Sequence, residues 1–149
     1  MKASRSCELY VDGASRGNPG PAGIGVVAFN GSAAPAHQLS KPIGQATNNV
    51  AEYLALIYAL HWALGAGYTA IAVKTDSELL VRQIHGQYRV REPHLRLFHD
   101  LAQDLFGHFA RWSLAHVPRE QNTQADRLAA AAARRALGAA RANDPSDAL

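Results

Sequence analysis

Four carboxylate side chains occupy positions where a folded chain could bring them together: Asp12, Glu52, Asp76 and Asp126. If these side chains meet, they repel one another and raise each other's pKa unless cations compensate. Carboxylate oxygens suit Mg²⁺ or Mn²⁺, and two such ions about 3.5–4 Å apart are the usual apparatus for phosphodiester cleavage. The chemistry open to this set is therefore metal-dependent cleavage of a nucleic-acid backbone.

Each carboxylate also has an ordinary structural explanation. Asp12 precedes Gly13, and an Asp-Gly pair most often forms a turn. Glu52 and Asp126 each stand three residues after a polar residue, which is the spacing of a capping box at the start of a helix. Asp76 lies between a predicted strand and a predicted helix, where aspartate is a favoured N-cap. The surrounding elements have to decide between these alternatives.

The pattern of apolar residues predicts both strands and helices. Short apolar or β-branched runs predict strands at residues 7–11, 23–30, about 33–42, 70–75 and 111–117. Apolar residues at three- and four-residue steps predict helices at 47–67, 77–84, 93–106 and 122–137. Strands joined by short turns are antiparallel, and strand–helix units add parallel strands. We therefore expect an α/β protein whose mixed sheet is flanked by helices.

This topology favours convergence of the four carboxylates. Asp12 and Asp76 then end neighbouring parallel strands at the same edge of the sheet. Glu52 and Asp126 lie in the first turns of helices that pack on that sheet. Ligands of open α/β sheets bind outside the carboxyl ends of the strands, so this edge is the expected site.

A glycine-rich segment follows the first strand, with glycines at Gly17, Gly20 and Gly23. A dinucleotide fingerprint requires such glycines between a strand and a helix, so that the pyrophosphate meets the N-terminus of the helix. Here the next element is a strand, and two prolines interrupt the glycines. The segment is therefore interpreted as a wide hairpin turn, and dinucleotide binding is excluded.

Composition limits the class of protein. The 149 residues are 48% hydrophobic, which predicts one domain at residues 1–138 and a disordered tail at 139–149. The formal net charge of +3 is compatible with a polyanionic partner. A single cysteine, Cys7, excludes an internal disulfide, and the seven histidines lack zinc-site spacing. Without an apolar run of about 20 residues, we expect a cytoplasmic protein with no membrane contact.

The segments YVDGASRGNPGPAG, TNNVAE, TDS and HVPREQN, the last followed by AD, occur in this order between residue 8 and about residue 137. Together they resemble the ribonuclease H type 1 family. The resemblance implies a five-stranded mixed sheet in which the first three strands are antiparallel. It also implies endonucleolytic cleavage of the RNA strand in RNA–DNA hybrids by a protein that we expect to be monomeric.

The resemblance assigns the four carboxylates to two Mg²⁺ ions, with Mn²⁺ as the alternative. Asp12 would bridge both ions, and Asp126 would join it at the ion that activates the attacking water. Glu52 and Asp76 would hold the ion beside the leaving 3′ oxygen. Cleavage by this arrangement leaves a 5′-phosphate and a 3′-hydroxyl.

The resemblance also supplies candidates for substrate binding. Asn18 in the glycine segment, with Asn48 and Asn49 before Glu52, would sense 2′-hydroxyl groups, because an amide can donate to a hydroxyl and accept from it. Thr47 matches a position that helps to hold a phosphate of the DNA strand. The alternative is that residues 47–49 only cap a helix.

The chain departs from the family pattern in two places. Many members carry a histidine in the loop before the last aspartate, but PREQNTQA has none, so Glu120 or Asn122 is the candidate to approach the metals. His116 falls in the preceding predicted strand and is expected to be packed or hydrogen-bonded. Some members also insert a basic protrusion between the second and third helices, where this chain has only GQYRVRE. Affinity for a hybrid would then depend on scattered residues such as Arg82, Arg89 and Arg91.

Two other functions remain to be separated from ribonuclease H activity. A nuclease of the same fold could act on DNA, but Asn18 and the TNN segment match the members that read hybrids. A binding module without catalysis is the second alternative. A pure binder of polyanions gains nothing from four clustered carboxylates, which argues against it.

Overall fold

The computed structural model describes residues 5–142 of the chain. Within this range, five strands and four α-helices follow one another in the predicted order. The strands are β1 (Ser6–Ser15), β2 (Gly20–Phe29), β3 (His37–Ala46), β4 (Ala70–Thr75) and β5 (Arg111–His116). The helices are α1 (Asn48–Gly65), α2 (Glu78–Ile84), α3 (Pro93–Phe106) and α4 (Thr123–Ala142), with a 3₁₀ turn, η1 (Arg119–Gln121), before α4.

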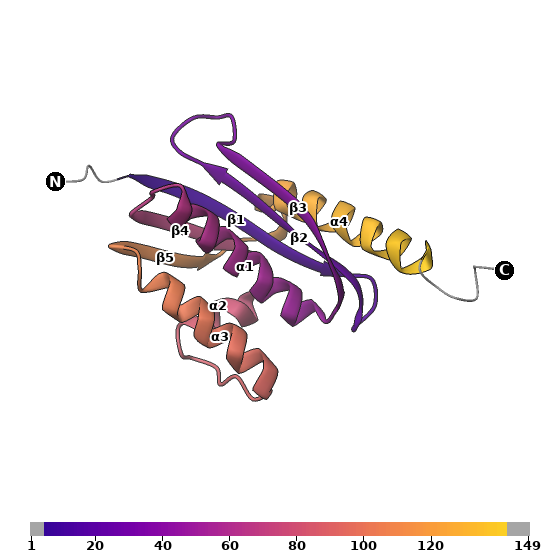
Figure 1. Ribbon diagram of the computed structural model, residues 1–149. Helices are drawn as coiled ribbons and strands as arrows, with labels where there is room; N and C mark the ends of the chain where they lie inside the picture. The colour runs from indigo at the N-terminus through magenta and orange to yellow at the C-terminus, as the bar shows by residue number, and fades with distance from the viewer. Residues whose placement is uncertain (1–4, 143–149) are drawn as a thin grey trace.

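The strands form one mixed sheet in the order β3-β2-β1-β4-β5. β1 pairs antiparallel with β2, and β2 pairs antiparallel with β3, whereas β4 is parallel to both β1 and β5. Figure 1 shows α1 and α3 on one side of the sheet and α4 on the other. The α/β architecture with three antiparallel strands at its start is therefore confirmed.

The main core lies between the sheet and α1 to α3. Its fully buried side chains include Leu9 of β1, Ile24 of β2, Leu56 of α1 and Phe106 of α3. Burying an aliphatic or aromatic side chain of this size stabilises the fold by roughly 1.5–3 kcal/mol. The resulting rigid support under β1 and β4 is what fixes the edge of the sheet where the carboxylates lie.

The structure differs from the predicted bounds in three main places. β1 and β2 together reach from Ser6 to Phe29, because the glycine segment continues both strands and leaves only residues 16–19 as the turn. The Asn-Gly pair at residues 30–31 opens a loop that continues to Ala36, whose N–H donates to the carbonyl of Ala28, so β3 starts at His37 rather than near residue 33.

The third difference concerns the C-terminal end. Residues 139–142, which were expected to be a disordered tail, continue α4 to Ala142. Alanine is the best helix former, and Ala136 is still buried against the sheet, so the helix is both intrinsically favoured and anchored. The rest of that expected tail, residues 143–149, lies outside the described residues. Among the residues that are described, no helix has the length and apolar character needed to cross a membrane.

Candidate active site

Asp12 lies on β1, in the interior of the sheet. The turn that an Asp-Gly pair suggests does not form, because β1 continues to Ser15 and Asp12 pairs with Gly25 of β2. On its other side, β1 pairs with β4 only as far as Tyr10, which lies opposite Lys74. Asp12 and Asp76 each follow this last pair by two residues. The two aspartates therefore stand at the same level, where the parallel strands separate.

Asp76 does not cap α2. Ser77 is the N-cap, and its hydroxyl accepts a hydrogen bond of 3.2 Å from the N–H of Leu80. The capping explanation of Asp76 is therefore wrong. Its carboxylate remains available to the cluster at the end of β4.

Glu52 also has a role other than capping. The N-cap of α1 is Thr47, whose hydroxyl accepts from the N–H of Val50 at 3.2 Å. Oε1 of Glu52 instead accepts a 2.8 Å hydrogen bond from the N–H of Gly13. A Cβ atom at position 13 would lie 2.3 Å from the carbonyl carbon of Ala51, so glycine is needed there to let α1 approach β1.

The carboxylates of three residues form a tight cluster. Oxygen atoms of Asp12, Glu52 and Asp76 all lie within 4.8 Å of one another. The Asp12 side chain is only 4% exposed, and this burial, together with the charges of Glu52 and Asp76, raises the pKa of its carboxyl far above the ordinary value. Burial likewise raises the pKa of Glu52, although the hydrogen bond from Gly13 opposes that shift. The cluster is thus short of positive charge.

Asp126 approaches the cluster from the opposite face of the sheet. It lies in the first turn of α4, half-buried, and hydrogen bonding between its carboxyl and that of Asp12 further raises the pKa of Asp12. α4 can come this close because β2 carries glycine where the helix crosses it. A Cβ atom on Gly25 would lie 2.1 Å from the carbonyl oxygen of Ala125.

This donor set fits a hard divalent cation. The four side chains offer only oxygen atoms, which Mg²⁺ and Mn²⁺ prefer. Oε2 of Glu52 is buried and has no hydrogen-bond partner among the described residues. A buried carboxylate oxygen without a donor is costly, and a cation between the carboxylates would satisfy it. The residues therefore fit the expected metal. Within the described range, Asp12, Glu52 and Asp76 form the only group of three or more potential metal ligands.

The residues expected to bind substrate lie beside this cluster. Asn18 occupies the turn between β1 and β2, and its Oδ1 accepts a 3.0 Å hydrogen bond from the N–H of Asn48. Oδ1 of Asn48 in turn accepts from the N–H of Ser15 at 3.1 Å. Asn18, Asn48 and Asn49 are all exposed, so their amide groups border the surface next to Glu52. Thr47 is half-buried and caps α1.

The two auxiliary candidates, Glu120 and Asn122, both lie in the loop before α4 but differ in exposure. Glu120 is exposed on η1, whereas Asn122 is 1% exposed. Nδ2 of Asn122 donates a 2.9 Å hydrogen bond to the carbonyl of Val11, next to Asp12. Oδ1 of Asn122 is buried and has no hydrogen-bond partner in the described part of the chain. The side chain thus fastens the start of α4 to β1.

Sequence reasoning missed Arg119 and was wrong about the surroundings of His116. Nη2 of Arg119 lies 3.6 Å from Oδ1 of Asp126, and Arg119 belongs to a 3₁₀ turn that no apolar periodicity predicts. His116 does end β5, opposite Thr75, but it is exposed and its side chain makes no hydrogen bond within the described residues. The expectation of a packed or hydrogen-bonded histidine is therefore wrong.

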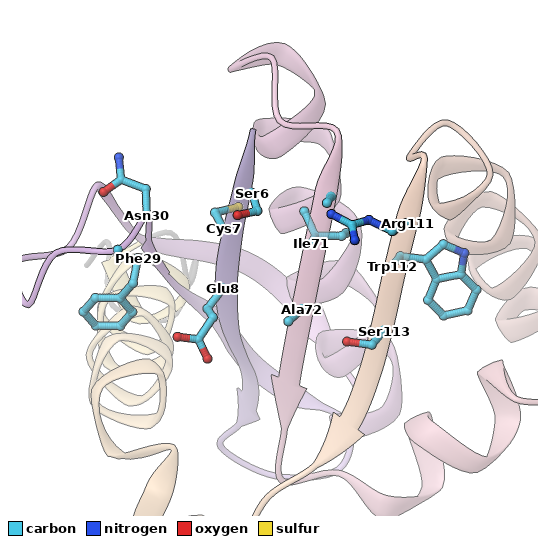
Figure 2. A pocket seen from close by; sticks show the side chains of 12 residues that line it. Ser6, Cys7, Glu8, Phe29, Asn30, Ile71, Ala72, Arg111, Trp112 and Ser113 are labelled. Atoms are coloured by element: carbon cyan, nitrogen blue, oxygen red, sulfur yellow. The ribbon is translucent and has the colours of Figure 1, made fainter. Parts of the chain in front are cut away.

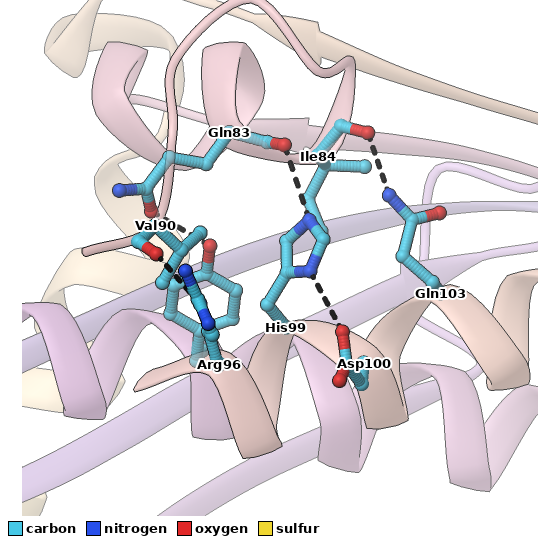
Figure 3. Close-up of polar contacts among 8 residues, drawn as sticks. Gln83, Ile84, Val90, Arg96, His99, Asp100 and Gln103 are labelled. Carbon is cyan, nitrogen blue, oxygen red and sulfur yellow. Dashed lines mark hydrogen bonds and ion pairs between the residues drawn. The ribbon is translucent and has the colours of Figure 1, made fainter. Parts of the chain in front are cut away.

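Polar side chains of α3 contact the end of α2 and the connection between α2 and α3 (Figure 3). Gln103 donates from Nε2 to the carbonyl of Ile84 at 2.7 Å, and a ring nitrogen of His99 lies 3.2 Å from the carbonyl of Gln83. Nε of Arg96 donates to the carbonyl of Val90 at 3.1 Å. The first two contacts fix the end of α2 against α3, and the third fixes the connection between them.

A pocket at the far end of the sheet is separate from this site. Figure 2 shows Ser6, Glu8, Ala72, Arg111 and Ser113 around it, on β1, β4 and β5. The pocket lies at the beginnings of these parallel strands, whereas the carboxylates gather at their ends. None of the four carboxylates lines it.

A mixed five-stranded sheet with carboxylates gathered where two parallel strands end defines an α/β protein with a candidate divalent-metal site. A family model described as reverse transcriptase-like matches residues 10–132. The ribonuclease H of Chromohalobacter salexigens is 35% identical over 140 residues, which is 83% of this chain and 82% of that protein. The ribonuclease HI of Halobacterium salinarum is 45% identical over 80% of this chain. The chain therefore belongs to the ribonuclease H type 1 family of hydrolases.

Solved structures agree with this assignment. The N-terminal ribonuclease H domain of Rv2228c from Mycobacterium tuberculosis superposes with a TM-score of 0.88 at 43% identity, over 92% of this chain and 99% of that one. LC11 ribonuclease H1, solved in complex with an RNA/DNA hybrid, gives a TM-score of 0.82 at 41% identity, over 88% and 99%. The chain spans 60% of the Halobacterium protein and 34% of the full-length bifunctional protein Rv2228c.

Proposed function

We propose that this protein is an endoribonuclease that hydrolyses the RNA strand of RNA–DNA hybrids. The observation that carries the proposal is the convergence of Asp12, Glu52 and Asp76, with Asp126 beside Asp12, at the end of the parallel strands. Relatives named ribonuclease H, and the LC11 structure with a bound hybrid, support this substrate class.

The four carboxylates are proposed to hold two Mg²⁺ ions, with Asp12 shared between them. Asp126 would complete the ligands on the side of the attacking water, and Glu52 and Asp76 would complete those on the side of the leaving oxygen. Mg²⁺ held there would supply a lowered pKa for a bound water and would stabilise negative charge on the phosphate and the leaving group. Hydrolysis of the P–O3′ bond would then give a 5′-phosphate and a 3′-hydroxyl.

The protein's own groups are proposed to place the hybrid. The amides of Asn18, Asn48 and Asn49 face the surface beside Glu52, where they can hydrogen-bond the 2′-hydroxyl groups that distinguish RNA from DNA. The Thr47 hydroxyl is proposed to help hold a phosphate of the DNA strand. Glu120 is the exposed auxiliary candidate for contacting metal-bound water. Asn122 is proposed to hold β1 and α4 together, because its amide donates to the carbonyl of Val11.

The test uses labelled duplexes of one sequence: an RNA–DNA hybrid, RNA–RNA and DNA–DNA, each with Mg²⁺, Mn²⁺ or EDTA. We expect cleavage of the RNA strand of the hybrid alone, with 5′-phosphate ends, and no cleavage in EDTA. Asp76→Asn should lower kcat at least about 1,000-fold, because it removes a negative ligand. Asp104→Asn, a matched change of an exposed aspartate on α3, should leave activity unchanged.

The same assay separates the competing functions. Equal cleavage of all three duplexes would support a DNA-directed or unselective nuclease. Binding of the hybrid without cleavage in any metal would support a binding module. Full activity of the Asp76→Asn protein would overturn the metal mechanism. We also propose a monomer in the cytoplasm, which light scattering and cell fractionation would test.

A further inference from the structure

We propose that Ser15 is a positioning residue that sets the selectivity for RNA by locking the glycine turn to the start of α1. The inference rests on the proposed function, and it concerns a residue outside the carboxylate cluster. Ser15 is the last residue of β1 and is half-buried, so its side chain is neither a core residue nor a free surface group.

The Ser15 hydroxyl lies among three backbone carbonyls. Oγ donates to the carbonyl of Ala46 at 2.8 Å, and it also contacts the carbonyl of Gly17 and, at 3.4 Å, that of Gly20. Gly17 and Gly20 flank the turn that carries Asn18, and Ala46 is followed directly by Thr47. A hydroxyl has a single proton and can donate to one carbonyl at a time. The hydroxyl therefore joins Ser15 to the end of β3 when it donates to Ala46, and to the glycine turn when it donates to Gly17 or Gly20.

The backbone of Ser15 completes the connection. Its N–H donates to Oδ1 of Asn48 at 3.1 Å, and the N–H of Asn48 donates to Oδ1 of Asn18 at 3.0 Å. Both amide oxygens are thus occupied by protein donors, which leaves the exposed NH₂ groups of Asn18 and Asn48 to donate to a substrate. The orientation of the two amides is set by these internal hydrogen bonds before the hybrid arrives.

A fixed orientation matters because a hydrogen bond to a 2′-hydroxyl group contributes to binding only in excess of the cost of ordering the groups that make it. If the Ser15 hydroxyl is removed, its hydrogen bond to Ala46 is lost. The turn with Asn18 and the start of α1 with Asn48 are then joined only by the Ser15–Asn48 and Asn48–Asn18 hydrogen bonds and by the pairing of Gly20 with Ala46, so the two amides are held less firmly. The carboxylates do not depend on this link, since Glu52 is held by Gly13. The loss should therefore appear in substrate selection rather than in the chemical step.

The experiment compares wild type, Ser15→Ala and Ser15→Thr on a full hybrid and on hybrids with one 2′-deoxy substitution at each position around the cleavage site. Wild type should lose kcat/KM strongly at the positions that the asparagines read. Ser15→Ala should raise KM for the full hybrid roughly tenfold, keep kcat within about twofold, and lose most of the penalty for the 2′-deoxy substitution. Ser15→Thr, which keeps a hydroxyl, should restore much of the discrimination.

Ser113→Ala, which removes an exposed hydroxyl on β5, is the matched control and should change nothing. Hydrogen exchange of the Asn48 N–H gives a readout that does not need activity, and it should be faster in Ser15→Ala. A wild type that cuts hybrids, together with an Ser15→Ala protein that keeps its KM and its 2′-deoxy penalties, overturns this inference alone. A uniform loss of kcat on every substrate also overturns it. A wild type that cuts no hybrid overturns the proposed function and this inference with it.

Discussion

At the scale of single residues, Asp12 is the most constrained group of the site. It is nearly inaccessible, it faces Glu52 and Asp76, and no basic side chain contributes to its pKa. Without a cation, the folded state therefore favours the protonated form of Asp12. Burying this carboxylate beside other carboxylates costs free energy in the metal-free protein, and binding of a cation would remove that cost.

This cost makes stability depend on pH. Because the pKa of Asp12 is raised in the folded state, folding takes up a proton between the ordinary pKa near 3.8 and the folded value. The contribution of Asp12 to stability is thus fully present below about pH 4 and decreases as the pH rises through neutrality. Asp12→Asn should be more stable than wild type in EDTA at pH 8, by on the order of 2 kcal/mol, and the difference should shrink toward pH 4.

Urea unfolding at several pH values, with and without Mg²⁺, measures this prediction. Mg²⁺ should raise the free energy of unfolding of wild type but not that of Asp12→Asn, since only the former gains a bound cation. Asp104→Asn should behave as wild type in both conditions. An Asp12→Asn protein that is less stable than wild type at pH 8 would contradict the account of the cluster.

The sequence singled out the four carboxylates as candidate metal ligands but could not exclude their capping roles. For Glu52 and Asp76 the true caps, Thr47 and Ser77, are close neighbours of the candidate residues, and propensity does not distinguish between such neighbours. The hydrogen bond from Gly13 to Glu52 joins residues 39 positions apart, which no local pattern reveals. Arg119 was missed because it lies on a 3₁₀ turn, which apolar periodicity does not predict.

At the scale of elements, the glycines of β2 decide where α4 lies. Gly23 and Gly25 have no side chains between the strand and the backbone of α4, and a Cβ atom at either position would lie under 2.5 Å from atoms of that helix. Sequence reasoning assigned Gly23 to a hairpin turn. The requirement comes instead from a helix about 100 residues later in the chain, so it could not be derived from the neighbours of the glycine.

Gly25→Ala should therefore displace the start of α4. We expect a loss of about 3 kcal/mol in the free energy of unfolding, because the added methyl group overlaps the carbonyl of Ala125. Activity should fall far more than the folded fraction, since Asp126 moves with the helix. Thermal unfolding and cleavage assays on folded protein check both parts.

Gly138→Ala is the matched control on α4. Nothing lies within 4 Å of a Cβ atom at this position, and alanine favours the helix. This variant should gain about 0.5–1 kcal/mol and keep full activity. Equal effects of the two substitutions would show that helix propensity, rather than the close approach to β2, governs position 25.

The elements themselves were predictable where one pattern dominated. α1, α3 and β4 follow from unambiguous apolar spacing, and their bounds agree with the structure within about two residues. β3 was misplaced because its residues, HQLSKPIGQA, are mostly half-buried or exposed and carry little apolar signal, and because a loop of unknown length precedes it. The end of α4 was missed because an alanine-rich segment can be either helical or frayed, depending on whether tertiary contacts anchor it.

At the scale of the whole molecule, the basic charge available to a nucleic acid is small. The formal net charge is +3, and Arg82 already pairs with Glu78 at 2.8 Å, while Arg96 bonds the carbonyl of Val90. Arg89 and Arg91 are exposed, and no acidic side chain in the described range pairs with them. The segment that replaces a basic protrusion thus offers two free arginines.

Hybrid binding should accordingly depend only moderately on salt. Two phosphate contacts predict a loss of affinity of roughly 12-fold between 50 and 200 mM monovalent salt, against roughly 1,000-fold or more for six to ten contacts. Fluorescence anisotropy with the Asp76→Asn protein measures this without cleavage. Replacing both Arg89 and Arg91 by Ala should lower the slope by about two phosphate equivalents. A slope unchanged by that double substitution would show that the hybrid is gripped elsewhere.

The separation of the carboxylates along the chain has a consequence for how the protein is made. Asp12 leaves the ribosome more than a hundred residues before Asp126, which reaches Asp12 only when α4 packs against β2. A nascent chain therefore cannot assemble the full set of metal ligands before α4 has been synthesised and has left the ribosome. A chain that stalls before α4 packs therefore lacks the fourth carboxylate at the site.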